Sequence, residues 1–560
     1  MSVLTGLFCR IAYLQLVKKE FLSDLASSQH KTLITLEPRR GSIYDRNMDL
    51  LAFNIKADSL YAMPRAIPES DKGEISRQLS SILGIKRGFI AERLSRDKAF
   101  VWIARKIHDG EAKKIKDLEL EGIGILEESK RCYPHSYLAS HILGFAGIDN
   151  NGLEGLEMWS DKYLKGRPGF RLTTRDAKRR LLSSKDEKYL SPVDGHNIIL
   201  TIDSAIQHIT ESCLDRAFRK YRAEAATIIV MDPNNGQILA MANRPTYDLS
   251  MYANAGPDER RNRAVSDVFE PGSVFKIILA SCVLEKGVVS PDDKFFCENG
   301  KYWVGGRCLH DHKPHGTLTF RQVIEKSSNI GTVKAAKLLK EKDFFDFIKK
   351  FGFGEKTGVD MPGEVEGILS SPSKWSKTSM TAIPIGHEVA VTAVQLASAV
   401  SAAANGGTLY RPWIIKEIRD NAGVSIRGFE AKAVREVISE GTSKTLRGIL
   451  KGVVEDGTGK AAALESYTSA GKTGTAQKIN PDGTYSHAKY LASFVGFAPA
   501  DDPKVTIVVC FDEPKPVYYG GVVAAPVFKE VAEEVLRYLE VSPDKGRPDK
   551  QNIILADKAG

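Results

Sequence analysis

The chain has 560 residues, of which 42% are apolar, so it is long enough to form two or three domains with buried cores. Its net charge is +9, but Lys and Arg are interspersed with a similar number of acidic residues. This pattern argues against nucleic-acid binding and fits a mildly basic surface that faces an anionic polymer or a membrane. The seven cysteines include no C-x-x-C pair, which argues against a zinc ribbon or a thioredoxin-like site.

Residues 1–17 are mostly apolar and end at Lys18-Lys19, with Arg10 inside the run. We expect a partial membrane anchor here, and a buried amphipathic helix is the alternative. A span needs roughly 20 apolar residues, and an arginine is tolerated near the interface. We therefore expect further apolar residues and a basic tail upstream of Met1. The alternative is that Met1 is the true start and the segment is a peripheral helix.

Residues 18–195 mix short strands and helices. A turn leads into a strand at 39–47, a helix begins at 151–157, and the glycines of 165–169 end it. We find no catalytic pattern in this part, and its composition indicates a scaffold domain.

Residues 196–540 read as one large α+β domain. A strand is predicted at 197–202, followed by a helix, and then a hairpin of 225–231 and 237–242 around the turn Asp232-Pro233-Asn234-Asn235-Gly236. Two more strands, 490–497 and 505–511, precede a helix at 526–539. Strands at both ends with helices between them predict an antiparallel sheet flanked by helices. Residues 541–560 form a polar tail.

The first candidate motif is Ser273-Val274-Phe275-Lys276, of the form S-x-x-K. The pattern alone is weak, because the chain contains at least five others, including Ser95/Lys98 and Ser486/Lys489. Here, however, Pro271-Gly272 forms a turn and an apolar helix follows. Ser273 is therefore expected at a helix N-terminus, where developing negative charge is stabilised, with Lys276 one turn away.

Two further motifs follow in order. Ser327-Ser328-Asn329 lies between two helical patterns and offers a hydroxyl and an amide that could relay a proton and hold a substrate amide. Lys472-Thr473-Gly474-Thr475 precedes strand-forming sequence. Its lysine could lower the pKa of Lys276, its hydroxyls could bind a carboxylate, and its glycine allows close approach to the backbone.

Other patterns fail on inspection. Lys356-Thr357-Gly358 lacks a hydroxyl at the next position, and Ser466 stands where a P-loop needs glycine. His387-Glu388 has no second histidine to complete H-E-x-x-H, and Gly272-Ser273 does not complete G-x-S-x-G. The cluster of Cys308, His310, Asp311, His312 and His315 has no ligand spacing, which favours a polar surface loop over a metal site.

The three motifs, in this order, resemble the active site of penicillin-binding proteins and serine β-lactamases. Segments outside the motifs are similar to the class B, monofunctional penicillin-binding proteins: 263–273, 351–354, 362–364 and 493–497, together with 40–47 and 155–157 for the pedestal domain. The resemblance covers essentially the whole chain. It implies a membrane anchor (1–17), a dimerisation or pedestal domain (18–195), a transpeptidase domain (196–540) and the tail.

The resemblance also implies a reaction, acyl transfer on the D-Ala-D-Ala end of peptidoglycan stem peptides. Ser273 would be the nucleophile, Lys276 its base, and Ser327 the proton shuttle. Asn329 would hold the donor peptide, and Lys472, Thr473, Gly474 and Thr475 would form the carboxylate-binding strand. The backbone N–H groups of Ser273 and Thr475 would form the oxyanion hole. No cofactor and no metal are implied, and β-lactams would acylate Ser273.

Ser327-Ser328-Asn329 is similar to the motif of the septal, cell-division branch, and the alternative is an elongation-type enzyme. The implied partners are the cytoplasmic membrane, a membrane glycan polymerase and divisome proteins, with the catalytic domain outside the cytoplasm. Two other classes share the motifs. A β-lactamase lacks the pedestal, and a β-lactam sensor should carry several membrane spans and a metalloprotease signature.

Cys297 and Cys308 flank two glycine-containing turns, so their segments could fold back as a hairpin. An exported domain would oxidise a well-placed pair, and the sequence leaves a disulfide and two free thiols equally open.

Overall fold

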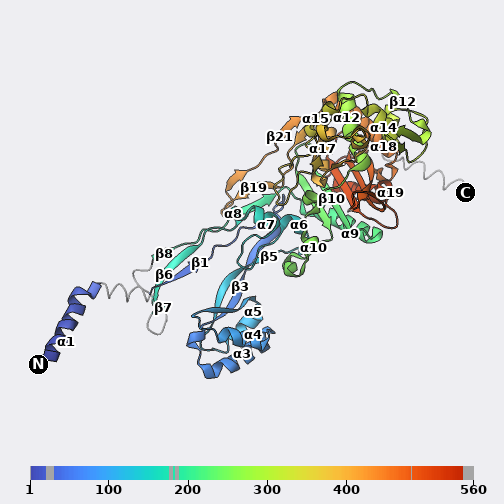
Figure 1. The fold of residues 1–560 in the computed structure, drawn as a ribbon. Coiled ribbons are helices and arrows are strands. Elements are labelled where there is room, and N and C mark those ends of the chain that lie inside the picture. Colours follow the sequence, from blue (N-terminus) through green and yellow to red (C-terminus); the bar gives the residue numbers. More distant parts are fainter. Residues whose placement is uncertain (1, 21–30, 176–180, 183–187, 481, 546–560) are drawn as a thin grey trace.

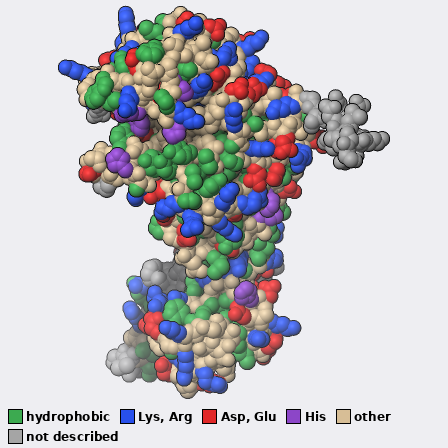
Figure 2. Space-filling model, turned by 90° about the vertical axis from the view of Figure 1, so that its right-hand side faces the viewer, with side chains coloured by type: hydrophobic (Ala, Val, Ile, Leu, Met, Phe, Trp, Pro, Cys, Tyr) green, Lys and Arg blue, Asp and Glu red, His purple; other side chains and the backbone are tan. Residues whose placement is uncertain are grey.

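The computed structural model describes residues 2–20, 31–175, 181–182, 188–480 and 482–545. It is elongated, with a large part at one end that contains the predicted catalytic residues, hereafter the catalytic part, and a smaller N-terminal part extending from it (Figure 1). A narrower region separates the two in the space-filling view (Figure 2). At the N-terminal end, α1 (Ser2–Ala12) continues into a short π-helix (Tyr13–Val17). Among the described residues, no helix is both long and apolar enough to cross a membrane.

The N-terminal part has two extensions (Figure 1). One is a narrow ribbon in which β1 (Lys31–Leu36) pairs with β6 (Gly169–Arg175), which also pairs with β7 (Leu181–Leu182) and β8 (Lys188–Leu190). The other is a small head with its own apolar core around Leu60, Leu79 and Ile90. The head is built from β3 (Leu50–Ala62), β4 (Val101–Ile107), β5 (Ile123–Cys132), α3 (Glu69–Leu83), α4 (Arg87–Leu94) and α5 (Asp109–Lys116).

A seven-stranded sheet joins segments that are far apart in the sequence. Its order is β20-β19-β9-β2-β3-β4, with β5 also paired to β3. The strand β2 (Ile43–Tyr44) runs parallel to β9 (Asn197–Leu200), which pairs in turn with β19 (Ile415–Arg419) and β20 (Ser425–Gly428) beyond it. The N-terminal segment at 43–44 is thus hydrogen-bonded into the base of the catalytic part.

A buried ionic cluster lies beside this sheet. Glu157, on α7 (Gly155–Trp159), accepts charged hydrogen bonds from Arg40 Nε and Arg131 Nε, each at 2.6 Å, and its side chain is fully buried. Arg40 also pairs with Asp161 at 2.6 Å. Each side-chain nitrogen of Arg40 has an acceptor, so its charge and its donors are satisfied together, whereas Arg131 Nη2 is buried without one. The cluster fixes the 40–47 turn against α7.

The catalytic part is built on a five-stranded antiparallel sheet of order β11-β10-β24-β23-β22. Alternate residues of one strand enter different cores. Ile228 and Val230 pack with α9 (Ser204–Tyr221) and α19 (Gly520–Tyr538), whereas Ile229 and Met231 join the core containing α12 (Lys276–Glu285), α17 (Ala393–Ala404) and α18 (Glu440–Glu455). The strands are β10 (Ala225–Met231), β11 (Ile238–Arg244), β22 (Ala470–Ile479), β23 (Tyr485–Ala498) and β24 (Val505–Asp512).

Shorter elements complete this part. The helices are α10 (Pro257–Arg260), α11 (Arg263–Ser266), α13 (Phe320–Glu325), α14 (Asn329–Ala336), α15 (Glu341–Lys350) and α16 (Ser379–Ala382). The small strand pairs are β12 (Lys294–Phe296) with β15 (Thr317–Thr319), β16 (Ile368–Leu369) with β17 (Val389–Ala390), and β18 (Thr408–Tyr410) with β21 (Ala433–Glu436). The predicted α+β class, the antiparallel sheet and the hairpin of β10 and β11 are confirmed.

The predicted start of the last helix at Pro526 is wrong, because α19 begins at Gly520 and contains the proline. Proline has no N–H to donate to the carbonyl four residues earlier, so Val522 loses its helical partner. The Tyr221 hydroxyl donates to that carbonyl at 3.0 Å. A side chain from α9 therefore lets the helix continue through the proline.

The structure contains no bond between Cys297 and Cys308, both of which are free thiols. The hairpin itself is present, as β13 (Lys301–Val304) pairs with β14 (Arg307–His310) and Cys308 lies opposite Trp303. Cys297 lies before this hairpin, is fully buried, and accepts a hydrogen bond from Ser328 Oγ at 3.4 Å. Burial against another element, which spacing cannot reveal, keeps the two sulfurs apart.

Candidate active site

Ser273 lies at the start of a helix, as predicted. It belongs to a single 3-10 turn (Gly272–Phe275) that leads directly into α12, of which Lys276 is the first residue. Ser273 is half-buried, whereas Lys276 is fully buried. Gly272 has a positive φ of 55° and packs against Thr475 and Ala476 of β22. The turn thus holds Ser273 at the edge of the five-stranded sheet.

Lys276 is the centre of the hydrogen-bond network. Its Nζ donates to the Ser327 carbonyl at 2.7 Å, to Asn329 Oδ1 at 2.7 Å and to Ser327 Oγ at 3.2 Å. Burial lowers the pKa of Lys276 to about 7, although Asp311 acts in the opposite direction. An amine with such a pKa is partly neutral at physiological pH and can accept a proton.

The second motif forms a tight connection between α13 and α14. Ser327 adopts φ 58°, an uncommon value for a residue other than glycine, and this conformation presents its side chain and its carbonyl to Lys276. Ser328 is the N-cap of α14 and accepts from the Gly331 N–H at 3.0 Å. Asn329 therefore begins the helix with its side chain toward Lys276.

The third motif lies on β22, an edge strand of the sheet. Lys472 is fully buried, and its Nζ donates to Ser327 Oγ at 2.9 Å. Burial, reinforced by the nearby Lys276, lowers the pKa of Lys472 well below its usual value. A side chain at Gly474 would lie 2.2 Å from Ser493 Oγ and 3.0 Å from the Pro271 carbonyl, so this position requires glycine.

The two threonines of this strand have internal partners. Thr473 Oγ1 is 2.8 Å from Thr458 Oγ1, and Thr475 Oγ1 accepts from the Gly520 N–H at 3.1 Å. The second K-T-G, at 356–358, lies in a loop away from this network, where the Thr357 and Gly358 N–H groups donate to Glu364.

Asp311 holds the second motif in place, a role that the sequence interpretation missed. Its carboxylate accepts from Ser328 Oγ at 2.6 Å and from the backbone N–H groups of Asn329 at 2.5 Å and Ile330 at 3.0 Å. It thereby fixes the second motif and the N-terminus of α14. No sequence signal could have found it, because it stands among histidines that suggested a polar surface loop and its contacts are 17–19 residues away.

The geometry joins four of the predicted residues directly, since Lys276 and Lys472 both donate to Ser327 and Lys276 also donates to Asn329. Ser273 is brought beside Thr475 by the preceding residue, Gly272. A Cβ placed on Gly272 would lie 3.2 Å from the Thr475 carbonyl oxygen. This arrangement can activate a nucleophile and return its proton to a leaving group. It offers a hydroxyl at a helix start (Ser273), a lysine of lowered pKa (Lys276) and a second hydroxyl between two lysines (Ser327).

Comparisons with known proteins agree with this architecture. Residues 226–533 match the model of the penicillin-binding protein transpeptidase domain, and residues 35–200 match the penicillin-binding protein dimerisation domain. The chain is 39% identical over 550 residues to stage V sporulation protein D of Bacillus subtilis, covering 97% of this chain and 85% of that protein. It is 32% identical to the peptidoglycan D,D-transpeptidase FtsI of Escherichia coli, and the match covers 97% of this chain and 90% of that protein.

Solved structures show the same relationship. Penicillin-binding protein 3 from Mycobacterium tuberculosis, in complex with aztreonam, has a TM-score of 0.72 and 30% identity, covering 91% of this chain and 98% of that one. A peptidoglycan synthetase from Bifidobacterium adolescentis has a TM-score of 0.74 and 27% identity, and the match covers 93% of this chain and 98% of that one.

Proposed function

The chain belongs to the class B penicillin-binding proteins, and from this membership we propose that it cross-links peptidoglycan stem peptides through an acyl-enzyme on Ser273. The enzyme is a serine-type D,D-transpeptidase, as its transpeptidase domain and its relatives indicate. The observation that carries the choice of residues is a network in which Lys276, one helical turn after Ser273, and Lys472 both donate to Ser327 Oγ.

In the first half-reaction, Ser273 Oγ attacks the carbonyl of the penultimate D-alanine and its proton passes to Lys276. A neutral Lys276 is available because burial lowers its pKa to about 7. The N–H groups of Ser273 and Thr475 stabilise the oxyanion, each such donor typically contributing roughly 10²–10³ in rate. The C–N bond then breaks, and Ser327 relays the proton to the departing D-alanine.

In the second half-reaction, an amine from another stem peptide attacks the Ser273 ester. A new amide forms, the C–O bond to Ser273 breaks, and the proton lost by the amine returns to the serine oxygen through the same lysine. Asn329 holds the donor peptide, and Lys472, Thr473, Gly474 and Thr475 bind the terminal carboxylate. β-Lactams acylate Ser273 in the same way.

The test is labelling with a fluorescent penicillin followed by peptide mapping. The adduct is expected on Ser273, and Ser273→Ala should lose all labelling while keeping the thermal unfolding midpoint. Ser95→Ala is the matched control, because Ser95 belongs to another S-x-x-K pattern and is exposed at the end of α4 (Arg87–Leu94). An adduct elsewhere, or rapid turnover of penicillin, would refute the transpeptidase assignment to Ser273.

We further propose a role in septal wall synthesis, with sporulation as a second candidate. Ser327-Ser328-Asn329 and the similarity to FtsI favour division, and the 39% identity to a stage V sporulation protein favours the second role. Depletion in growing cells separates them. A division block supports the septal role, whereas normal division with defective spores supports the other.

Attachment to the cytoplasmic membrane through α1 is also proposed, with a membrane glycan polymerase and divisome proteins as partners. The exposed apolar side chains of α1, Leu4, Leu7 and Phe8, have no covering element among the described residues. Flotation of the intact chain with liposomes should be lost in a Leu7→Asp/Phe8→Asp variant, and equal flotation of both proteins would argue against α1 as the attachment site.

A further inference from the structure

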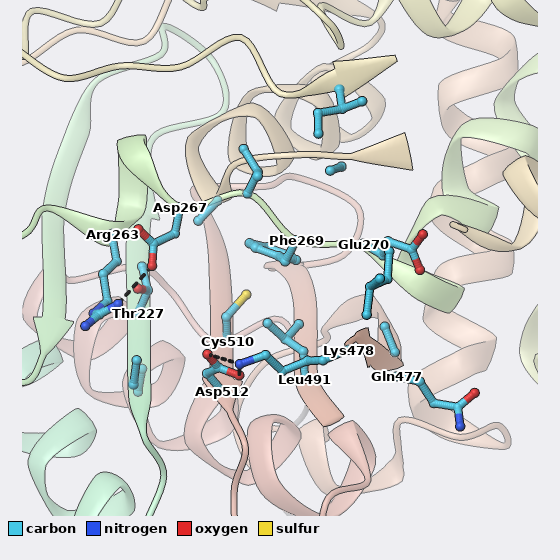
Figure 3. Close-up of a pocket in the computed structure, with 18 residues that line it drawn as sticks. Thr227, Arg263, Asp267, Phe269, Glu270, Gln477, Lys478, Leu491, Cys510 and Asp512 are labelled. Atoms are coloured by element: carbon cyan, nitrogen blue, oxygen red, sulfur yellow. Dashed lines mark hydrogen bonds and ion pairs between the residues drawn. The ribbon is translucent and has the colours of Figure 1, made fainter. Parts of the chain in front are cut away.

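A cavity of about 370 Å³ lies on the sheet beside the nucleophile turn (Figure 3). Its volume falls within the range of small-molecule sites. Small side chains create the space, since five of the lining residues are alanines: Ala225, Ala226, Ala390, Ala393 and Ala476. Phe269, Ile368 and Leu491 add larger apolar surface.

The charged side chains around the cavity are already paired. Arg263 Nη1 donates to Asp267 at 2.9 Å, and Lys478 Nζ is 2.9 Å from Asp512 (Figure 3). Glu270 faces away from the cavity and accepts from His387 and from the Glu388 N–H. A charged ligand would lose its hydration and find no free counter-ion, so the cavity favours a neutral molecule.

Two side-chain atoms of the cavity lining have no hydrogen bond, Asp512 Oδ1 and Arg263 Nε, and of these Asp512 Oδ1 still lies 2.9 Å from Lys478 Nζ as an ion pair. The Nε of Arg263 is buried without a hydrogen-bond acceptor, although the two terminal nitrogens of the same guanidinium are paired with Asp267 and Asp258. The side chain of Arg263 is only 10% exposed. An unsatisfied buried donor is costly, so an occupant that offers an acceptor gains a charge-assisted hydrogen bond.

The cavity shares a wall with the catalytic network. Its lining includes the residues just before Pro271-Gly272-Ser273 and those just after Thr475. Successive side chains of a strand alternate between faces, so Ala476 lies on the same face of β22 as Lys472. A Cβ placed on Gly272 would be 3.3 Å from that of Ala476, which puts the cavity wall in contact with the residue preceding Ser273.

We propose that this cavity is a second ligand site, for a neutral, mostly apolar molecule with one hydrogen-bond acceptor directed at Arg263 Nε. Its occupant is coupled to Ser273 through Ala476 and Gly272. By filling the space behind the turn, the occupant limits the movement of Gly272 and Ser273, and so slows acylation. A bound molecule can do this only if its contacts with the wall differ between the states of the turn, and the acylation rate measures that difference.

The binding test uses two matched fluorinated probes. 4-Fluoroacetophenone carries a carbonyl acceptor, and 1-ethyl-4-fluorobenzene has the same shape without it. By ¹⁹F NMR the ketone should bind about tenfold more tightly, as one hydrogen bond to a charged donor allows, and 4-fluorobenzoate should not bind. Equal affinity of the ketone and the hydrocarbon would overturn the role of Arg263, and absence of binding by both would overturn the site.

Two kinds of variant locate the site. Arg263→Lys keeps the cation beside Asp267 but removes the Nε donor, so the ketone should fall to the affinity of the hydrocarbon. Ala393→Leu fills the cavity from α17 and should abolish binding of both probes. Ala390→Leu, at a half-buried position, is the second filling variant if Ala393→Leu does not fold. Unchanged binding in a folded filling variant would place the probes elsewhere.

The coupling test measures the rate of penicillin acylation with the cavity saturated by 4-fluoroacetophenone. The rate should fall at least threefold in the parent protein and stay constant in the filled variant. An unchanged rate, with binding shown by NMR, would overturn the coupling. The NMR arm does not depend on Ser273 being the nucleophile, so failure of the proposed reaction and failure of the second site can be told apart.

Discussion

Lys276 shows how burial converts a common residue into a base. Its ammonium has neutral or like-charged neighbours at close range, and Asp311 is the opposing charge that limits the fall of its pKa to about 7. The sequence motif predicts the identity of this lysine and its position one turn from Ser273. The value at which it titrates depends on packing against the second motif and β22, which the sequence does not reveal.

The rate of acylation of Ser273 by penicillin should therefore rise with pH through about 7, because the base must be neutral before it can take the serine proton. Stopped-flow labelling between pH 5.5 and 8.5 measures this profile. Lys276→Ala should lower the rate by roughly 10²-fold or more while leaving the fold intact, as expected for loss of a general base. A flat pH profile, or normal labelling of Lys276→Ala, would contradict the assignment.

Asp311 gives a second prediction at this scale. Asp311→Asn leaves one oxygen where two accepted from Ser328, Asn329 and Ile330, so the free energy of unfolding should fall by about 1–2 kcal/mol. The pKa of Lys276 also loses the influence that raises it, so the midpoint of the pH profile should move to lower pH. Asp292→Asn, at an exposed position, is the control and should change neither quantity.

Among the elements, α19 shows how a helix tolerates an internal proline. Tyr221→Phe removes only the hydroxyl that satisfies the Val522 carbonyl, and should lower the free energy of unfolding by about 1 kcal/mol. In a Pro526→Ala background the new N–H can take that carbonyl, so the same Tyr221 substitution should cost much less. Urea unfolding of the double-mutant cycle measures the difference, and equal effects in both backgrounds would exclude this compensation.

The sequence predicts the local elements of the catalytic part well and their long-range pairing poorly. The hairpin of β10 and β11 follows from alternation and a turn with glycine, and the antiparallel sheet follows from the order of elements. The pairing of 43–44 with 197–200 and of that strand with 415–419 could not be predicted, because nothing local encodes a partner so distant. The start of α19 was missed for the same reason, since its proline is compensated from another helix.

The burial of Cys297 against Ser328 makes a similar point about the disulfide prediction. The glycines between the cysteines, Gly305 and Gly306 at the turn among them, do allow a hairpin, and the structure contains one. The Cys297 sulfur is held by Ser328, the N-cap of α14, a contact that the local sequence does not encode. Alkylation of the denatured, unreduced protein should therefore modify all seven cysteines, and modification of only five would indicate a disulfide after all.

For the whole molecule, the buried ionic cluster beside the seven-stranded sheet should contribute far more to the free energy of unfolding than an exposed ion pair does. Glu157→Gln would leave Arg40 and Arg131 buried without their shared counter-ion, and should destabilise the N-terminal part by about 3–5 kcal/mol. Glu127→Gln, which removes an exposed pair with Lys56, is the matched control and should cost less than about 1 kcal/mol. Similar unfolding midpoints for the two variants would argue against the cluster as a structural centre.

The elongated arrangement has a hydrodynamic consequence. A compact chain of this length would have a radius of gyration of about 24 Å. With a ribbon and a head that extend away from the catalytic part, the protein should exceed that value in small-angle scattering and show a long tail in its distance distribution (Figure 1). It should also elute from a sizing column ahead of globular standards of equal mass. Light scattering on the same peak separates shape from association, because only association raises the mass above 61.6 kDa.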